Sequence, residues 1–164
     1  MIRPKVNLQL STIDKTFEIV GWMAFLCIWI LIIVNYHRLP NSIPIHYNGK
    51  GEVDGFGGKT SIIILPTIAS FLFVGMTYLN KFPHLFNYPT NITDDNAPIQ
   101  YTYATRLIRY LKTIIVIIFG WSTLQTIRGA IGSTNSLGVW LFPMMSGLIF
   151  IPIVYFVVKS MNAK

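Results

Sequence analysis

The chain has 164 residues, of which 52% are hydrophobic and only 12% are charged, whereas about 25% of the residues in a typical soluble domain are charged. This composition excludes an ordinary soluble domain, because a chain of this length cannot keep so much apolar surface from water. The net charge of +7 does not indicate nucleic-acid binding, because the basic residues flank apolar runs and form no patch with interleaved aromatic residues.

Four apolar runs alternate with polar segments along the chain. A helix needs about 20 mainly apolar residues to cross a bilayer, and the predicted helices are residues 17–36, 60–79, 111–130 and 139–158. Pro66, Pro143 and Pro152 lie within the runs and are expected to bend their helices. Because the runs are apolar on all faces, the sequence predicts an all-α integral membrane protein with a four-helix transmembrane bundle.

The helices and their connections are expected to form one membrane domain, residues 17–158, between an N-terminal tail, 1–16, and a C-terminal tail, 159–164. The first run is longer than the apolar part of a signal peptide and precedes no small-residue cleavage site, so it is expected to remain as an anchor. Nine Lys and Arg residues fall on the side of the two tails and four on the other. Since these residues are enriched in cytoplasmic segments, the tails and the loop 80–110 are predicted inside and the loop 37–59 outside.

The outer loop has the pattern of a short β-hairpin. Between Ile43 and Tyr47 apolar residues occupy every second position, which is typical of a strand. Asn48-Gly49 is a strong hairpin-turn signal, and residues 53–56 could supply the return strand. We therefore expect an extended or hairpin-like extracellular loop over the outer end of the bundle.

The inner loop leads into a basic stretch. Asp94-Asp95 followed by Pro98 favours a turn that enters a helix near Ile99. Three basic residues then recur at every third position, Arg106, Arg109 and Lys112. Their long side chains are expected to snorkel to the lipid headgroups as a solvated collar at the membrane interface. The loop 131–137 is short and uncharged, so the third and fourth helices are expected to form an antiparallel pair.

The outer loop also carries a longer motif, Leu39-Pro40-x-x-Ile43-Pro44-x-His46-x-Asn48-x-x-Gly51-Glu52-x-Asp54, with Lys59 opening the second helix. This motif, together with Gln100-Tyr101 ahead of the third helix, resembles the signature of the SdpI-like family of bacterial membrane proteins. The resemblance implies a multi-pass protein of the bacterial plasma membrane. The named member of that family is an immunity protein that protects a cell from a secreted toxic peptide and helps to signal its presence. That member continues into further helices, so this chain is expected to hold only the shared domain, whose function is unknown.

Three metal-competent side chains, His46, Glu52 and Asp54, lie within nine residues of the outer loop. Zinc takes three or four nitrogen, sulfur or oxygen ligands, so these side chains could hold a metal ion. The alternative is that His46 and Asp54 satisfy the loop backbone by hydrogen bonding. The sequence contains none of the paired-His or Cys-pair metal motifs, and no cofactor is expected.

Arg128 lies near the outer end of the third helix, on the same face as Trp121 and Gln125. Two positions of its side chain are compatible with the sequence. It could snorkel outward to the interface, or it could turn inward and pair with Glu52 or Asp54. The second arrangement would clamp the outer loop onto the bundle.

Three classes of function compete. The resemblance and the lack of a catalytic motif favour a non-enzymatic receptor or immunity module, whose outer loop binds a peptide or protein partner. The small size favours an accessory subunit of a membrane complex, and four helices with little interior volume make self-association a further expectation. The third class is a membrane metalloenzyme that uses the three metal-competent side chains. No nucleophile elbow is present, so no enzymatic activity is expected.

Overall fold

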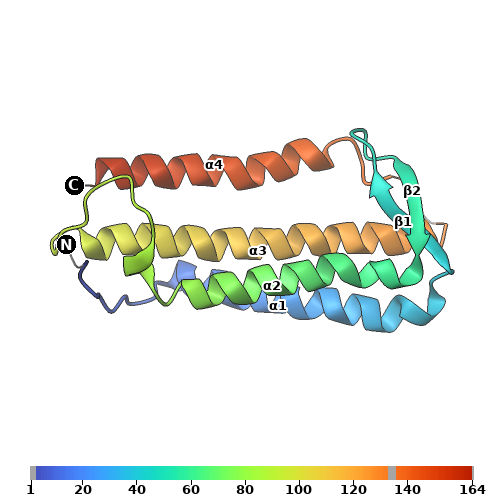
Figure 1. Ribbon diagram of the computed structural model, residues 1–164, viewed down its shortest axis with the longest axis horizontal. Helices are drawn as coiled ribbons and strands as arrows, with labels where there is room; N and C mark the ends of the chain where they lie inside the picture. Colours follow the sequence, from blue (N-terminus) through green and yellow to red (C-terminus); the bar gives the residue numbers. More distant parts are fainter. Residues whose placement is uncertain (1–2, 133–135, 164) are drawn as a thin grey trace.

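The computed structural model describes residues 3–132 and 136–163, which form four long helices, a two-stranded β-hairpin and three short 3-10 helices. The long helices are α1 (Thr12–Asn35), α2 (Ile64–Leu79), α3 (Ala97–Ala130) and α4 (Leu141–Asn162). The hairpin, β1 (Ser42–Tyr47) and β2 (Val53–Gly58), connects α1 to α2 at one end of the bundle (Figure 1). The 3-10 helices are η1 (Tyr36–Arg38), η2 (Lys59–Ile63) and η3 (Pro83–Leu85).

Each long helix is long and apolar enough to cross a bilayer, α1 together with η1 and α2 together with η2. Large apolar side chains are exposed along all four of them, and α4 buries only 6% of its most apolar stretch. Exposed apolar surface of this extent is typical of a surface that faces lipid. The prediction of a four-helix membrane protein with a hairpin between the first two helices is therefore confirmed.

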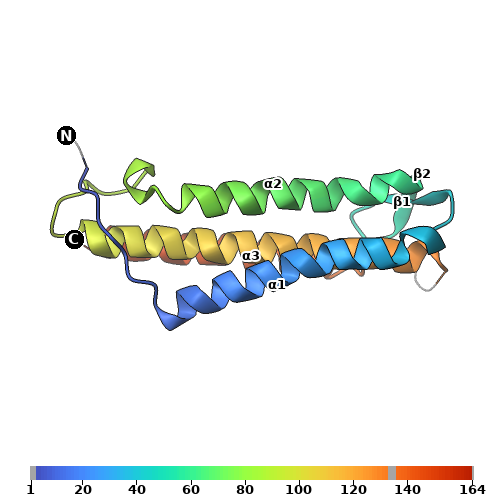
Figure 2. The ribbon, with the colours of Figure 1, turned by 90° about the horizontal axis from the view of Figure 1, so that it is seen from below.

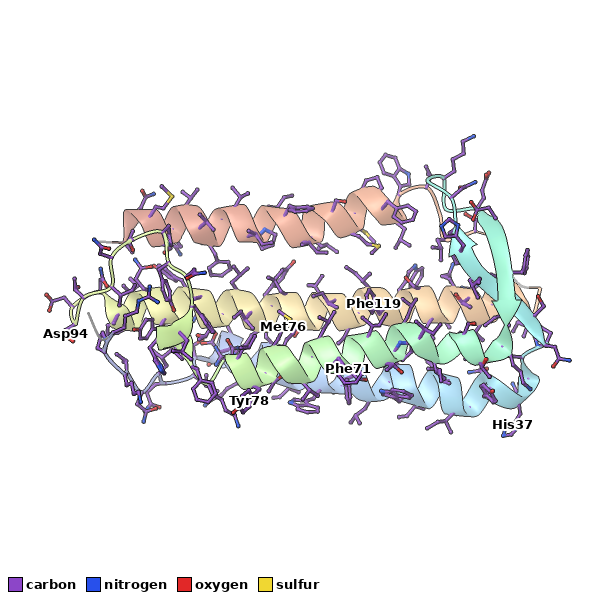
Figure 3. The ribbon with its side chains drawn as sticks, in the orientation of Figure 1. His37, Phe71, Met76, Tyr78, Asp94 and Phe119 are labelled. Atoms are coloured by element: carbon purple, nitrogen blue, oxygen red, sulfur yellow. The ribbon has the colours of Figure 1, made fainter. Side chains whose placement is uncertain are left out.

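Helix α3 is the central element, and α1, α2 and α4 all pack against it. Helix α4 lies on one side of α3, and α1 and α2 lie on the other (Figure 1). Figure 2 shows α1 crossing α3 obliquely. We call the end of the bundle that carries the hairpin the hairpin end, and the opposite end, where both ends of the chain lie, the terminal end. His37 marks the hairpin end and Asp94 the terminal end in Figure 3.

Two helices begin earlier than the apolar runs predict. Helix α1 starts at Thr12 instead of residue 17, because Ser11 and Asp14 form a capping box in which the N–H group of each residue donates to the side chain of the other. Helix α3 starts at Ala97, close to the start predicted near Ile99. Much of the predicted loop 80–110 is therefore helical, since polar residues continue the helix beyond its apolar part.

The three prolines differ in their effect. Pro66 and Pro143 are each the third residue of a helix, where a backbone N–H has no partner within the helix and none is lost. Only Pro152 lies inside a helix, and it cannot donate to the carbonyl of Leu148 four residues earlier. The hydroxyl of Tyr110 on α3 donates to this carbonyl instead, over 3.1 Å. The three prolines were expected to bend their helices, but only Pro152 lies where a hydrogen bond of the helix is lost.

The hairpin is antiparallel and irregular. Ser42 pairs with Gly58, Ile43 with Gly57 and Pro44 with Phe56, and the register then shifts twice before Tyr47 pairs with Val53. These shifts bend the strands, as β-bulges do. The predicted alternation of β1 is broken, because the adjacent residues Ile43 and Pro44 are both buried. Ile43 belongs to an apolar cluster that also contains Ile32, Leu39, Ile62 and Ile127, so the loop shares a core with the membrane helices.

Candidate functional site

The turn of the hairpin is built by the polar residues of the loop motif. The N–H of Gly51 donates to the carbonyl of Asn48, and the N–H of Asn48 donates to the carbonyl of Glu52. The side-chain oxygen of Asn48 accepts from the N–H groups of Lys50 and Glu52, and its amide nitrogen donates to the Glu52 carboxylate over 3.0 Å. The hairpin turn predicted at Asn48-Gly49 is thus confirmed, and it extends to Glu52. The left-handed residue is Gly51, with φ +78°, because the turn is longer and ends in a glycine bulge.

The hairpin is fixed to the connection between α3 and α4. The carbonyl of Gly51 accepts from the N–H of Leu137 over 2.7 Å and from the Ser136 hydroxyl over 3.0 Å. The Cα of Gly51 lies so close to Gly138 that an added Cβ would stand 2.9 Å from its carbonyl oxygen. On the bundle side, the Tyr47 and Thr126 hydroxyls are 3.3 Å apart. The turn glycine is therefore needed both for its φ angle and for close packing.

The three metal-competent side chains of the loop do not converge. His46 Nδ1 lies 2.5 Å from Asp54 Oδ1 across the hairpin, and both side chains are exposed. The carboxylate of Glu52 accepts a hydrogen bond from the side chain of Asn48 instead. Across residues 3–132 and 136–163, no group of three or more His, Cys, Asp or Glu side chains is placed to hold a metal ion. The structure thus bonds His46 to Asp54 rather than to the loop backbone.

Arg128 does not clamp the loop. Its side chain is exposed, and the ion pairs found within the described part of the chain include none between Arg128 and Glu52 or Asp54. The hypothesis of a clamp through Arg128 is therefore wrong, because Asp54 pairs with His46 and the turn is held through the backbone of Gly51. The alternative, an outward side chain, agrees with the exposure of Arg128.

The remaining motif residues shape the junction between the hairpin and the helices. Leu39 and Pro44 are buried, whereas Pro40 is exposed. Lys59 begins η2, where its N–H donates to the carbonyl of Asn41 over 3.1 Å. Its ammonium group lies 5.2 Å from the centre of the Tyr36 ring, a cation–π contact. These residues fix the path of the chain from α1 into the hairpin and back into α2.

A pocket of about 360 Å³ lies beneath the hairpin. Its walls come from β1, from η2 and the first turn of α2, from α3, and from the start of α4, and it is lined by Ile43, Pro44, Ile45, His46, Tyr47, Ser61, Ile62, Ile64, Leu65, Ser122, Thr123, Thr126, Leu137 and Phe142. Its volume lies within the range of small-molecule sites, which are mostly apolar with a few polar groups. We call it the hairpin pocket.

The hairpin pocket combines apolar walls with a few hydroxyl groups. Thr123 is almost fully buried, and its hydroxyl donates to the carbonyl of Phe119 within α3. Because this hydroxyl already has a partner, Thr123 contributes mainly its methyl group to the pocket. Thr126 is held near Tyr47, whereas no hydrogen bond of the Ser61 and Ser122 side chains is found among the described residues. The arrangement can therefore hold an apolar group and offer hydrogen bonds at a few points. Among the residues that the structure describes, no hydrogen bond joins a serine of the pocket to His46.

A second cluster lies at the terminal end, where five charged side chains meet. Asp14 and Glu18 of α1 face three basic residues of α3, Arg106, Arg109 and Lys112. Arg106 binds Asp14 through two hydrogen bonds of 2.9 and 3.1 Å. We call this group the ion-pair cluster. Its basic residues were expected to snorkel as a solvated collar, and that prediction is wrong because both carboxylates of α1 bind them inside the bundle.

Lys112 is the most deeply buried member of the ion-pair cluster, with 0% of its surface exposed. Its ammonium group donates to Glu18 Oε2 over 2.7 Å and to Thr77 Oγ1 of α2 over 2.8 Å. It also lies 4.7 Å from the centre of the Phe73 ring. A charge within a membrane bundle is costly unless it is paired, and here one lysine joins three helices. The cluster thus determines how the terminal end is assembled.

Sequence reasoning missed Asp14 and Glu18 as partners, although a signal was present. The two acids are four residues apart, and the three bases are spaced by three, so each set lies on one helix face. The hydroxyl residues of the hairpin pocket on α3 were also missed. Ser122 and Thr126 are four residues apart as well, but small hydroxyl residues in apolar runs are too common to single them out.

These features define a multi-pass membrane protein with a hairpin-capped four-helix bundle. Residues 23–69 match the model of a domain of unknown function, DUF1648, and this segment contains the loop motif and parts of both flanking helices. An uncharacterised protein of Archaeoglobus fulgidus is 28% identical over 88 residues, which cover 49% of this chain and 48% of that protein. The chain thus matches about half the length of this curated relative, and the similarity extends to an archaeon. No solved structure matches the chain.

Proposed function

We propose that the chain is a membrane receptor module without enzymatic activity, which holds apolar side chains of a peptide partner in the hairpin pocket. The observation that carries this proposal is the pocket itself, about 360 Å³ beneath a hairpin that is bonded to both the bundle and the α3–α4 connection. Preformed apolar pockets with a few convergent polar groups are the usual form of a binding site.

The surroundings of the pocket support a peptide rather than a small polar ligand. Ile45 and Phe56 of the hairpin are large, apolar and exposed, and His46 lies beside them at the surface. Aromatic and aliphatic anchors of this kind contribute most of the energy of peptide binding. The resemblance of the loop motif to the SdpI-like family points to the same class of ligand, a toxic peptide that acts on membranes. In this proposal the hairpin end faces outward, as the distribution of Lys and Arg favours.

A protection assay tests the proposal. Cells that lack the protein express the wild type, Ser122→Trp or Phe71→Trp, and are challenged with a panel of membrane-active toxic peptides. Ser122 lines the pocket, so the indole of Ser122→Trp fills it. Phe71 is 76% exposed on α2, so its replacement is a matched control. We expect the wild type and Phe71→Trp to raise the inhibitory concentration of at least one peptide, and Ser122→Trp not to do so.

Two results would contradict the proposal. One is unchanged sensitivity to every peptide in the panel when the wild type is present in the membrane. The other is equal protection by Ser122→Trp and the wild type, which would show that the partner does not use the pocket. Immunoblotting of membrane fractions controls for the amount of each variant.

A further inference from the structure

We infer that the hairpin pocket holds an acyl chain of a membrane lipid, which enters between α2 and α4. This inference goes beyond the proposed function and does not depend on it, because it concerns what fills the pocket in the bilayer when no partner is bound. It rests on the position of the pocket, on its exposed lining residues and on the chemistry of its walls.

The pocket is lined by residues of two helices that both pack on α3, namely α2 and α4. Helices α2 and α4 both pack on α3, and α4 lies on the side of α3 opposite α1 and α2 (Figure 1). The pocket is lined by Ile64 and Leu65 on the α2 side and by Phe142 on the α4 side. Residues of α3 and β1 supply the other walls, and we place the opening between α2 and α4.

The lining residues at this opening are apolar and face outward. Ile64 is 53% exposed and Phe142 is 39% exposed, although both line the pocket. Each belongs to a helix that is apolar enough to cross the bilayer, so the environment that meets them is lipid. A polar ligand would have to cross this apolar opening, whereas a hydrocarbon chain enters it without losing hydrogen bonds to water.

The position of the pocket along α3 fits an acyl chain whose polar end remains near the hairpin. Ser122 on the pocket wall precedes the exposed Arg128 by six residues, which corresponds to about 9 Å along the helix. The pocket wall therefore lies deeper in the bilayer than the interface, where the charged group of an exposed arginine is placed. His46 and Tyr47 line the pocket beneath the hairpin, where they could meet the ester or headgroup of the lipid.

Physical chemistry argues against an empty or water-filled pocket. Apolar walls bind water poorly. If the pocket were empty, the atoms that line it would lose dispersion contacts. Lipid chains are present at high concentration at the opening, so they fill it without a specific partner. A peptide that binds in the pocket must therefore displace the chain, which favours ligands that are apolar themselves.

Photocrosslinking in nanodiscs tests the inference with the full chain. The probe is phosphatidylcholine that carries a diazirine on one acyl chain, and adducts are located by peptide mass spectrometry. Ile43 of β1 lines the pocket and is fully buried, so a chain that reaches it does so through the pocket. We expect adducts there and at Phe142 in the wild type. In Ser122→Trp the yield of adducts on β1 should fall by about tenfold, since the introduced indole side chain occupies much of a pocket this small.

Two further variants make the result interpretable. Ser61→Phe fills the pocket from η2, the opposite wall, and should also lose the β1 adducts, while Phe71→Trp should keep them. Adducts on the exposed face of α1 should be the same in all variants, which shows that each protein is folded in the bilayer. The inference is overturned if the wild type has no β1 adducts, because no lipid chain then occupies the pocket. A peptide could still bind there. The inference is overturned equally if the adducts persist in both filled variants.

The two proposals fail separately. The crosslinking experiment contains no peptide, so a negative result leaves the receptor proposal standing. A negative protection assay, in turn, leaves the lipid site standing.

Discussion

The ammonium group of Lys112 on α3 lies 2.7 Å from the carboxylate of Glu18 on α1, and no part of Lys112 is exposed. The two residues are far apart in the sequence, yet they set the spacing of two membrane helices. Thr77 of α2 accepts a further hydrogen bond from the same ammonium group. A buried ion pair contributes little net stability, but removal of one partner leaves the other uncompensated and is strongly destabilising.

Replacement of Lys112 by methionine is therefore expected to lower the free energy of unfolding by about 3 kcal/mol. Glu18 retains Arg109 at 3.2 Å but loses its shortest contact. The measurement is reversible unfolding in mixed micelles, followed by circular dichroism. Lys15→Met is the matched control, because Lys15 is exposed on the first turn of α1, and its effect should stay within about 0.5 kcal/mol.

The double variant Glu18→Gln with Lys112→Met distinguishes pairing from packing. Because it removes both charges, its loss of stability should be smaller than the sum of the two single losses. Strictly additive losses would show that Glu18 and Lys112 do not interact in the folded protein.

The hydroxyl of Tyr110 is expected to stabilise the fold only because Pro152 cannot donate a hydrogen bond to the carbonyl of Leu148. Tyr110→Phe should cost about 1 kcal/mol, since the carbonyl of Leu148 loses its donor. In a Pro152→Ala background the new N–H of residue 152 can bond that carbonyl, so the same change should cost much less. Unfolding of the four proteins of this cycle measures the difference. An equal cost in both backgrounds would rule out the proposed link between the two residues.

Two glycines of the hairpin turn should respond differently to alanine. Gly51→Ala places a side chain at φ +78° and within 2.9 Å of the Gly138 carbonyl oxygen, and it should destabilise the protein by about 2 kcal/mol. Gly49 has open space around its Cα and a negative φ, so Gly49→Ala should be close to neutral. Hydrogen exchange at the N–H of Leu137, which donates to Gly51, should become faster only in Gly51→Ala. A larger effect at Gly49 would show that the turn has another form.

The membrane bundle could be predicted from the sequence because hydropathy is a local property. Each apolar run identifies a helix by its own composition, and the turn signals around Asn48 identify a hairpin. The start of α1 at Thr12 was missed because the capping box of Ser11 and Asp14 lies in a polar segment that hydropathy assigns to the tail. Asp14 was then left outside the membrane domain, and its pairing with Arg106 could not be anticipated.

The sites depend on contacts between distant segments, which composition does not encode. Arg106, Arg109 and Lys112 have the spacing of an interfacial collar, and only the approach of α1 converts them into the ion-pair cluster. The hairpin pocket likewise requires β1, α2, α3 and α4 together. His46, Glu52 and Asp54 illustrate the opposite case, because their proximity in sequence suggested a metal site, whereas the fold divides them between a cross-strand pair and a turn.

The central claim is that an open pocket lies beneath the hairpin. Thiol labelling of the protein in nanodiscs tests it most directly, with a small reagent that enters the bilayer and exchanges with a lipid chain in the pocket. In a Cys27→Ala background, Ser122→Cys introduces a thiol on the pocket wall, and Val116→Cys introduces one at a fully buried core position of the same helix. We predict that N-ethylmaleimide labels Ser122→Cys much faster than Val116→Cys, and that Ser61→Phe slows this labelling by filling the pocket. Labelling of Ser122→Cys as slow as that of Val116→Cys would contradict the account.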